Sequence, residues 1–185
     1  PLGNLIVVGG SLPESIPAGD TFMASLRTGL ERAEAPQVLL ATADMPDLKT
    51  TSVWRFLELC ENRAALNYPI VPAELCAERY PGMKRTTLRL REGTFTGGNL
   101  ALIDRSSMGR WLPMLEQAYA ARKKPLTLAG MVGTGTLARV LASKVFPSLL
   151  GIADLERAVG RMLKAEVHGV RVELPEIGAD LDSVE

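Results

Sequence analysis

The chain has 185 residues, of which 46% are hydrophobic and 23% are charged. A chain of this length buries about 70% of its unfolded surface, so its core needs no metal ion or disulfide to be stable. Its 21 basic and 21 acidic residues cancel, which argues against the positively charged surface that binds nucleic acids and anionic membranes. We therefore expect one globular domain, or one domain with an appendage, that binds neither nucleic acid nor a membrane surface.

The scarcity of histidine and cysteine argues against two further classes of site. His168 is the only histidine, so a zinc site and a Ser-His-Asp triad are both disfavoured. Cys60 and Cys76 either form a disulfide or stay as thiols, and their apolar surroundings favour buried free thiols in a reducing cytoplasm. No apolar run reaches the roughly 18 residues of a membrane-spanning helix, and no signal peptide is visible, so we expect a cytoplasmic protein.

The first half of the chain alternates short apolar runs with helical patterns. The run NLIVVGG ends in two glycines, which is typical of a buried strand that leads into a loop. Phe22, Leu26 and Leu30 recur every four residues and form a helix stripe, which either Asp20 or Thr21 can cap. The predicted elements are a strand at 4–10, a helix at 21–33, a strand at 37–43, a helix at 49–62 and a strand at 64–72.

The second half begins with strands and continues with helices. Residues 85–104 alternate, turn at Gly93 and become continuously apolar from Leu100, which predicts a hairpin arm followed by a core strand. Residues 107–166 are mostly helical in pattern, and residues 169–182 close the chain with a strand and a polar turn. Because apolar strands alternate with helices, we predict a three-layer Rossmann-like α/β domain with a mostly parallel sheet and helices on both faces.

Asp44 directly follows an apolar strand, and Pro46 then stops the strand ladder. In open parallel sheets, ligands bind in the crevice beyond the carboxyl ends of the strands, so Asp44 is placed where a ligand is expected. The alternative is that Asp44 only caps the next helix or forms an Asx-turn.

The stretch FTGGN places Gly97 and Gly98 within a strand pattern. Paired glycines there indicate a bulge or a close approach of the backbone to something else, and a ligand held by backbone amides needs such a lack of side chains. Asn99 adds a donor and an acceptor for sugar hydroxyls or a phosphate. The alternative is a simple hairpin turn that enters the core strand.

Four stretches together resemble the MobA-like nucleotidyltransferases, the group that includes molybdenum-cofactor guanylyltransferase. ATADMPDL resembles the strand end of that family, and PAGDTFMASLRTGL resembles the loop and helix that lie against its nucleotide. Residues 68–104 resemble a little-characterised prokaryotic branch in which YPIVP, KRT and FTGGN occur in this order, and GADLDSVE resembles the closing motif. The resemblance covers most of the chain and implies the fold of the nucleotide-diphospho-sugar transferases.

The resemblance also implies a magnesium site. In the family the strand-end aspartate binds the Mg²⁺ that bridges the nucleotide phosphates, and Asp44 matches it as both a metal ligand and a catalytic residue. A second carboxylate near the chain end matches Asp180 or Asp182. Mg²⁺ prefers hard oxygen ligands and often takes only one or two carboxylates besides phosphate oxygens, so the residue types suit it. The alternative for Asp180 and Asp182 is a solvated turn.

The remaining candidates come from the same resemblance and surround this aspartate. An NTP and a phosphorylated small-molecule acceptor are the implied ligands, and cations such as Lys84 pair with their phosphates. The implied residues are Gly19, Asp20 and Thr21 for the nucleotide, Arg85, Gly97, Gly98 and Asn99 for the second substrate, and Lys84 for catalysis.

One family feature is missing from the sequence. The family begins with a glycine-rich loop that carries a basic residue, whereas the loop at Gly9 and Gly10 has none. We expect residues 1–185 to be a single nucleotidyltransferase-like domain that lacks its first strand and loop, part of a protein of roughly 230 residues. Mg²⁺-dependent nucleotidyl transfer is the leading function, and a non-catalytic nucleotide-binding or regulatory module is the alternative. A Rossmann dehydrogenase is disfavoured because no G-x-G-x-x-G follows a strand.

Overall fold

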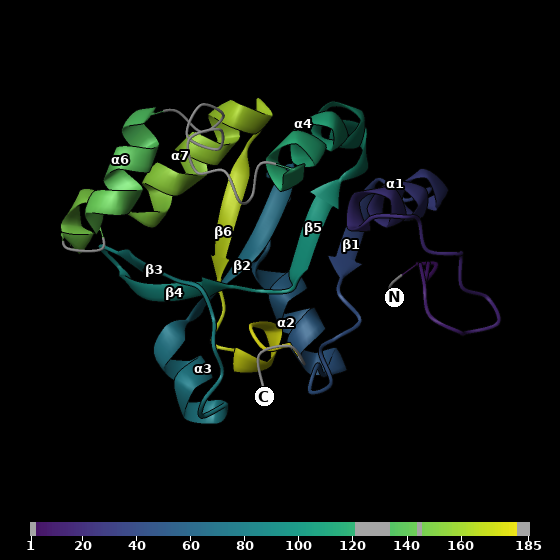
Figure 1. Cartoon of the computed structure of the whole chain (residues 1–185), viewed down its shortest axis with the longest axis horizontal. Helices are drawn as coiled ribbons and strands as arrows, with labels where there is room; N and C mark the ends of the chain where they lie inside the picture. Colours follow the sequence, from purple (N-terminus) through teal and green to yellow (C-terminus); the bar gives the residue numbers. More distant parts are fainter. Residues whose placement is uncertain (1–2, 121–133, 144–145, 181–185) are drawn as a thin grey trace.

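A computed structural model describes residues 3–120, 134–143 and 146–180 of the chain, and the elements below belong to those residues (Figure 1). The helices are α1 (Phe22–Arg32), α2 (Thr50–Leu59), α3 (Ala73–Arg79), α4 (Met108–Ala120), α6 (Thr134–Ser143) and α7 (Ile152–Leu163), with short 3-10 turns η1 (Arg105–Ser107), η2 (Pro147–Leu149) and η3 (Pro175–Ile177). The strands are β1 (Gln37–Ala41), β2 (Leu66–Pro72), β3 (Thr87–Leu90), β4 (Gly93–Gly97), β5 (Leu100–Asp104) and β6 (Val167–Arg171).

The six strands form one sheet in the order β1-β5-β2-β4-β3, with β6 also paired to β2. The predicted Rossmann-like domain with a mostly parallel sheet is wrong, because β2 with β6 is the one parallel pairing between these strands and the others are antiparallel. The physical reason lies in residues 87–104, where three strands follow one another with no helix between them. A parallel neighbour needs a crossover of a dozen or more residues, so closely spaced strands pair antiparallel instead.

The predicted buried strand at 4–10 is also wrong. Its backbone makes only one isolated bridge, between Val8 and Ile16, and the side chain of Leu5 is 88% exposed. A short apolar run becomes a strand only where a neighbouring strand takes up its N–H and C=O groups, and no described strand runs beside this one. Apolar composition alone therefore gave the wrong prediction for this segment.

The helix predicted at 21–33 is confirmed as α1, and Thr21 rather than Asp20 caps it. The Thr21 hydroxyl accepts a hydrogen bond from the N–H of Ala24 at 3.1 Å. Leu30 is buried at one end of the stripe, whereas Phe22 at the other end is 56% exposed and stacks on Tyr119 of α4. The stripe thus packs against the sheet at one end and against α4 at the other.

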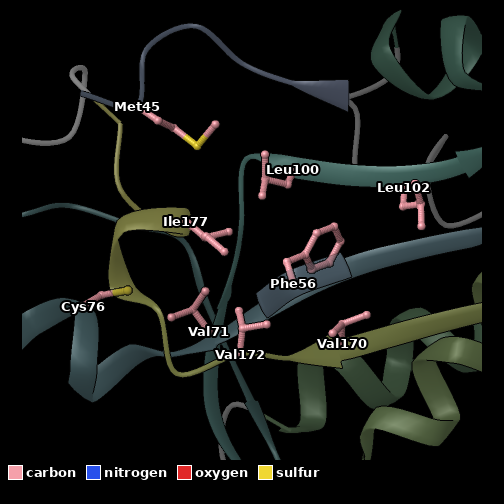
Figure 2. Packing of buried hydrophobic residues seen from close by; sticks show 9 residues of the cluster. All are labelled: Met45, Phe56, Val71, Cys76, Leu100, Leu102, Val170, Val172 and Ile177. Atoms are coloured by element: carbon pink, nitrogen blue, oxygen red, sulfur yellow. The ribbon is translucent and has the colours of Figure 1, made fainter. Parts of the chain in front are cut away.

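Helices cover both faces of the sheet, as alternate residues of β5 show. Leu100 and Leu102 point into a cluster with Phe56 of α2, whereas Ile103 points into a second cluster with Trp111 of α4. Figure 2 shows the first cluster at close range. Its buried members are Met45, Phe56, Val71, Cys76, Leu100, Leu102, Val170, Val172 and Ile177.

No helix in the described ranges combines the length and the apolar character that crossing a bilayer requires.

Candidate functional site

Asn99, at the junction of β4 and β5, joins three parts of the chain. Its carbonyl accepts a hydrogen bond from the N–H of Thr42, just beyond the end of β1, at 3.2 Å. Its own N–H donates to the carbonyl of Ile177 at 2.9 Å, and its Nδ2 donates to the carbonyl of Ala179 at 3.1 Å. The loop that carries Asp44 and the segment that carries Asp180 are therefore both tied to one residue.

The buried cluster beneath this junction fixes the same three segments. Figure 2 shows Met45, Leu100 and Ile177 projecting into it from three different elements. Met45 follows Asp44 and Leu100 follows Asn99, so each side chain anchors the backbone beside a candidate site residue. Close packing of this kind holds backbone positions to a single arrangement.

The glycine pair is explained by close approach and not by a hairpin turn. β4 continues into β5 along the same neighbour, β2. A Cβ atom on Gly97 would lie 2.5 Å from the hydroxyl oxygen of Tyr68, and one on Gly98 would lie 2.7 Å from the Cγ2 atom of Ile177 and 2.8 Å from the Cγ atom of Pro69. The atoms that approach this backbone belong to the chain itself.

Arg85 and Asp180 form an ion pair beside Asn99. The guanidinium donates to the Asp180 carboxylate, to the carbonyl of Gly97 at 2.9 Å and to Oδ1 of Asn99 at 3.5 Å. The side chains of Arg85 and Asp180 are only 17% and 14% exposed. Asp180 therefore does not lie in a solvated turn, and four of the residues predicted from the sequence meet here. Lys84, by contrast, is exposed.

Asp44 has a buried oxygen without a partner. Its Oδ1 atom is inaccessible to solvent and makes no hydrogen bond with the described residues. The helix-cap alternative does not hold, since the N-cap of α2 is Lys49. Leaving a buried acceptor unsatisfied costs about 1–3 kcal/mol, and more for a charged group, so this oxygen lacks either a donor or a cation. Below, the Asn99 site means Asp44, Arg85, Gly97, Gly98, Asn99 and Asp180.

The candidate carboxylates are of the kind that Mg²⁺ binds. Among residues 3–120, 134–143 and 146–180, no group of three or more His, Cys, Asp or Glu residues is arranged to hold a metal ion. Asp44 offers a hard, unpartnered oxygen and Asp180 a carboxylate shared with Arg85, while Asp182 lies outside the described residues. Mg²⁺ is commonly held by one or two carboxylates together with phosphate oxygens and water. Asp44 and Asp180 offer the carboxylates of such a site.

The candidate nucleotide residues lie elsewhere, at the start of α1. The N–H of Gly19 donates to the hydroxyl of Ser25 at 3.0 Å, Asp20 is exposed, and Thr21 is the helix cap. Thr21 also lines a cavity of about 420 Å³ between α1 and α4, and the lining of this cavity includes none of the residues of the Asn99 site. The structure thus separates the predicted residues into two places, and a nucleotide role for this trio stays a prediction.

Tyr68 is the residue beside the site that sequence reasoning missed. Burial raises the pKa of its phenol, and the nearby charge of Arg85 lowers it in part. The signal was present in the glycine pair, because a glycine within a strand leaves room for a large side chain on the neighbouring strand. Tyr68 on β2 fills that room above Gly97.

No protein-family model matches the chain, and no curated protein is similar enough to count as a relative. Among solved structures, one described as a hypothetical transferase from Thermus thermophilus is similar, with a TM-score of 0.80 and 37% sequence identity. The match covers 95% of this chain and 78% of the Thermus chain. This chain and the Thermus protein belong to one family. The narrower resemblance to MobA-like enzymes is not confirmed by these comparisons and stays a prediction.

Proposed function

We propose that the chain is a Mg²⁺-dependent nucleotidyltransferase, which moves a nucleoside monophosphate from an NTP to a phosphorylated small molecule. The observation that carries the proposal is the buried, unpartnered Oδ1 of Asp44 on a loop that Asn99 ties to the Arg85–Asp180 pair. A carboxylate that lacks a cation and a guanidinium that suits phosphate oxygens are held in one place, which is the pairing that a phosphate-transfer site requires.

The chain's own residues act by holding and orienting charge. An oxygen of the acceptor phosphate forms a bond to the α-phosphorus of the NTP, and the bond from that phosphorus to the bridging oxygen breaks to release pyrophosphate. Bound at Asp44, Mg²⁺ would offset the negative charge that builds up on the phosphates and on the leaving group. Arg85 has a planar array of donors for phosphate oxygens, and Gly97 and Asn99 accept hydrogen bonds from one of its nitrogens and so help to hold that array in place.

The family relation supports the general class of the proposal. The Thermus protein is described as a hypothetical transferase, and at 37% identity over 95% of this chain the two share their fold. The relation to the Thermus protein thus supports transferase chemistry in general. The nucleotide, the acceptor and the metal are proposed from the site alone.

Release of pyrophosphate is the direct test. The chain is incubated with Mg²⁺, each of the four NTPs and a panel of sugar phosphates and other phosphate monoesters, and pyrophosphate is measured. We expect acceptor-dependent release from the native chain, none from Asp44→Asn, and native release from Asp47→Asn. Asp47 is a matched control because it lies in the same loop but is exposed and engages Arg79 and Tyr80. Equal release from Asp44→Asn and the native chain would overturn the proposal.

One observation favours a second candidate, a nucleotide-binding module without transferase activity. Residues 3–26 include no basic residue, and Arg27 is paired with Glu116. The loop at Gly9 and Gly10 therefore offers no cation to a triphosphate, and losing one electrostatic donor typically slows such reactions by about 10²–10³-fold. A module of this kind binds Mg²⁺ and NTP in calorimetry but releases no pyrophosphate with any acceptor, which separates the two candidates.

A further inference from the structure

Arg85 is held in place by two kinds of partner that differ in how easily they exchange. The carbonyl of Gly97 and Oδ1 of Asn99 belong to the β4–β5 junction, which the buried cluster anchors through Leu100. Among the ion pairs of the described residues, the guanidinium of Arg85 has one charged partner, the Asp180 carboxylate. An oxyanion that displaced this carboxylate would find the guanidinium already oriented.

Asp180 can change its side-chain contact without moving its backbone far. The segment before it is tied to Asn99 through the carbonyls of Ile177 and Ala179, and the side chain of Ile177 is fully buried. These backbone ties do not involve the Asp180 carboxylate, so the segment stays attached to the site when the side chain of Asp180 exchanges Arg85 for another partner.

Two groups compete for the same carboxylate. Asp44 presents an unsatisfied oxygen on the loop that Asn99 also holds, so a cation bound there would attract Asp180 as a second carboxylate. Arg85 holds Asp180 when no cation is bound. If Asp180 turns toward the cation, the guanidinium of Arg85 loses its anionic partner. A buried unpaired charge is costly, so this guanidinium then favours another anion.

We propose that Arg85 is a phosphate-binding residue whose guanidinium pairs with Asp180 in the resting state. Cation binding at Asp44 and Asp180 then frees the guanidinium for a phosphoryl group. The inference rests on the proposed metal site and goes further, because it makes phosphate binding at Arg85 depend on metal binding through the exchange of Asp180. The phosphoryl group belongs either to the polyphosphate of the NTP or to a phosphate monoester acceptor.

The test is calorimetric titration of the 185-residue chain with glycerol 3-phosphate and, separately, with inorganic pyrophosphate, each with and without Mg²⁺. We expect Mg²⁺ to strengthen the binding of the phosphate probe to the native chain. Without Mg²⁺, Asp180→Asn should bind the same probe on the order of 10- to 100-fold more tightly than the native chain does, the range expected for one charge-assisted contact. The probe that shows this gain identifies the source of the phosphoryl group.

Variants of the guanidinium complete the test. Arg85→Met should lose phosphate binding under all conditions, and Arg85→Lys should retain only part of it because an ammonium lacks the fork of parallel donors. Arg55→Met is the matched control, since Arg55 is 59% exposed and pairs with Glu58 on the outside of α2. Circular dichroism and urea denaturation establish that each variant is folded, and the Asp180→Asn result stands independently if Arg85→Met is not.

The inference fails if, without Mg²⁺, Asp180→Asn binds phosphate no more tightly than the native chain does, or if Arg85→Met binds phosphate with native affinity. That failure is distinct from failure of the proposed function. Loss of pyrophosphate release in Asp44→Asn would still stand in that case, whereas an unaffected Asp44→Asn would reject the metal site on which both depend.

Discussion

The carbonyl of Asn99 accepts a hydrogen bond from the N–H of Thr42 at 3.2 Å, which joins the end of β1 to the β4–β5 junction. Asp44 lies two residues beyond this bond, and the side-chain amide of Asn99 reaches the carbonyl of Ala179, next to Asp180. The segments of two carboxylates that are 136 positions apart in the sequence, from 44 to 180, are thus attached to one residue, the first through its backbone and the second through its side chain. Removal of the Asn99 side chain should loosen the Asp180 segment.

Asn99→Ala should lower the free energy of unfolding by about 1–3 kcal/mol, because it removes the partner of the Ala179 carbonyl and one acceptor of Arg85. Urea denaturation measures the change. Asn62→Ala is the control, since Asn62 is exposed, and it should stay within about 0.5 kcal/mol of the native chain. Equal effects of the two substitutions would mean that Asn99 is not a structural tie.

Gly98→Ala should destabilise the fold by about 1–3 kcal/mol, because the new methyl group meets Ile177 and Pro69 at distances that real Cβ atoms do not adopt. Pro69 belongs to β2 and Ile177 to η3, which leads to Asp180, so the substitution should push the Asp180 segment away from β2. The matched substitution Gly109→Ala places a methyl group in open space at the start of α4 and should be neutral or stabilise by up to about 1 kcal/mol. Thermal or urea unfolding of both variants distinguishes crowding from a general effect of losing glycine.

Both cysteines should react slowly as long as the chain is folded. They are free in the structure, and burial raises the pKa of the Cys60 thiol to about 11 and also raises that of Cys76. At pH 8 a thiol of pKa 11 is about 0.1% thiolate, so a disulfide reagent such as DTNB should label the native chain slowly and label two thiols at once after unfolding in guanidinium.

The same shift predicts a direction for the pH dependence of stability. The folded pKa of Cys60 lies above the ordinary value of 9.0, so the neutral thiol contributes stability that is fully present below pH 9 and is lost as the pH rises through about 11. Cys60→Ser should flatten this part of the stability curve. In the labelling experiment with DTNB, finding fewer than two thiols after unfolding would establish a disulfide instead.

The parts of the fold that local patterns determine could be read from the sequence. The four-residue spacing and a capping residue at Asp20 or Thr21 predicted α1, and the alternation before Gly93 predicted the β3–β4 hairpin, because helix periodicity, capping and turn chemistry act between near neighbours. The direction of β5 could not be read in this way. Whether a strand runs parallel or antiparallel depends on which strand it joins. β5 pairs with both β1 and β2, which are distant from it in the sequence, and β4 pairs with β2.

The candidate site likewise has residues that local sequence patterns indicate and contacts that they do not. Asp44 was recognisable because a carboxylate follows an apolar strand, and Gly98 because a glycine interrupts one. That Asp180 pairs with Arg85 is a long-range contact with no local sequence signal, because it depends on how the chain end folds back onto the sheet. The glycine pair indicated a close approach at Gly97, but not that Tyr68 of β2 is the side chain that makes it.

The measurement that tests the central claim most directly is calorimetric titration of Mg²⁺ with each NTP into the native chain, Asp44→Asn and Asp47→Asn. Asparagine at position 44 keeps the shape of the side chain but removes the charge, so the fold should be as stable as that of the native chain or more stable, given the buried oxygen that has no partner. The account predicts that Mg²⁺-dependent NTP binding is lost in Asp44→Asn and unchanged in Asp47→Asn. Unchanged NTP affinity of a folded Asp44→Asn in the presence of Mg²⁺ would contradict it.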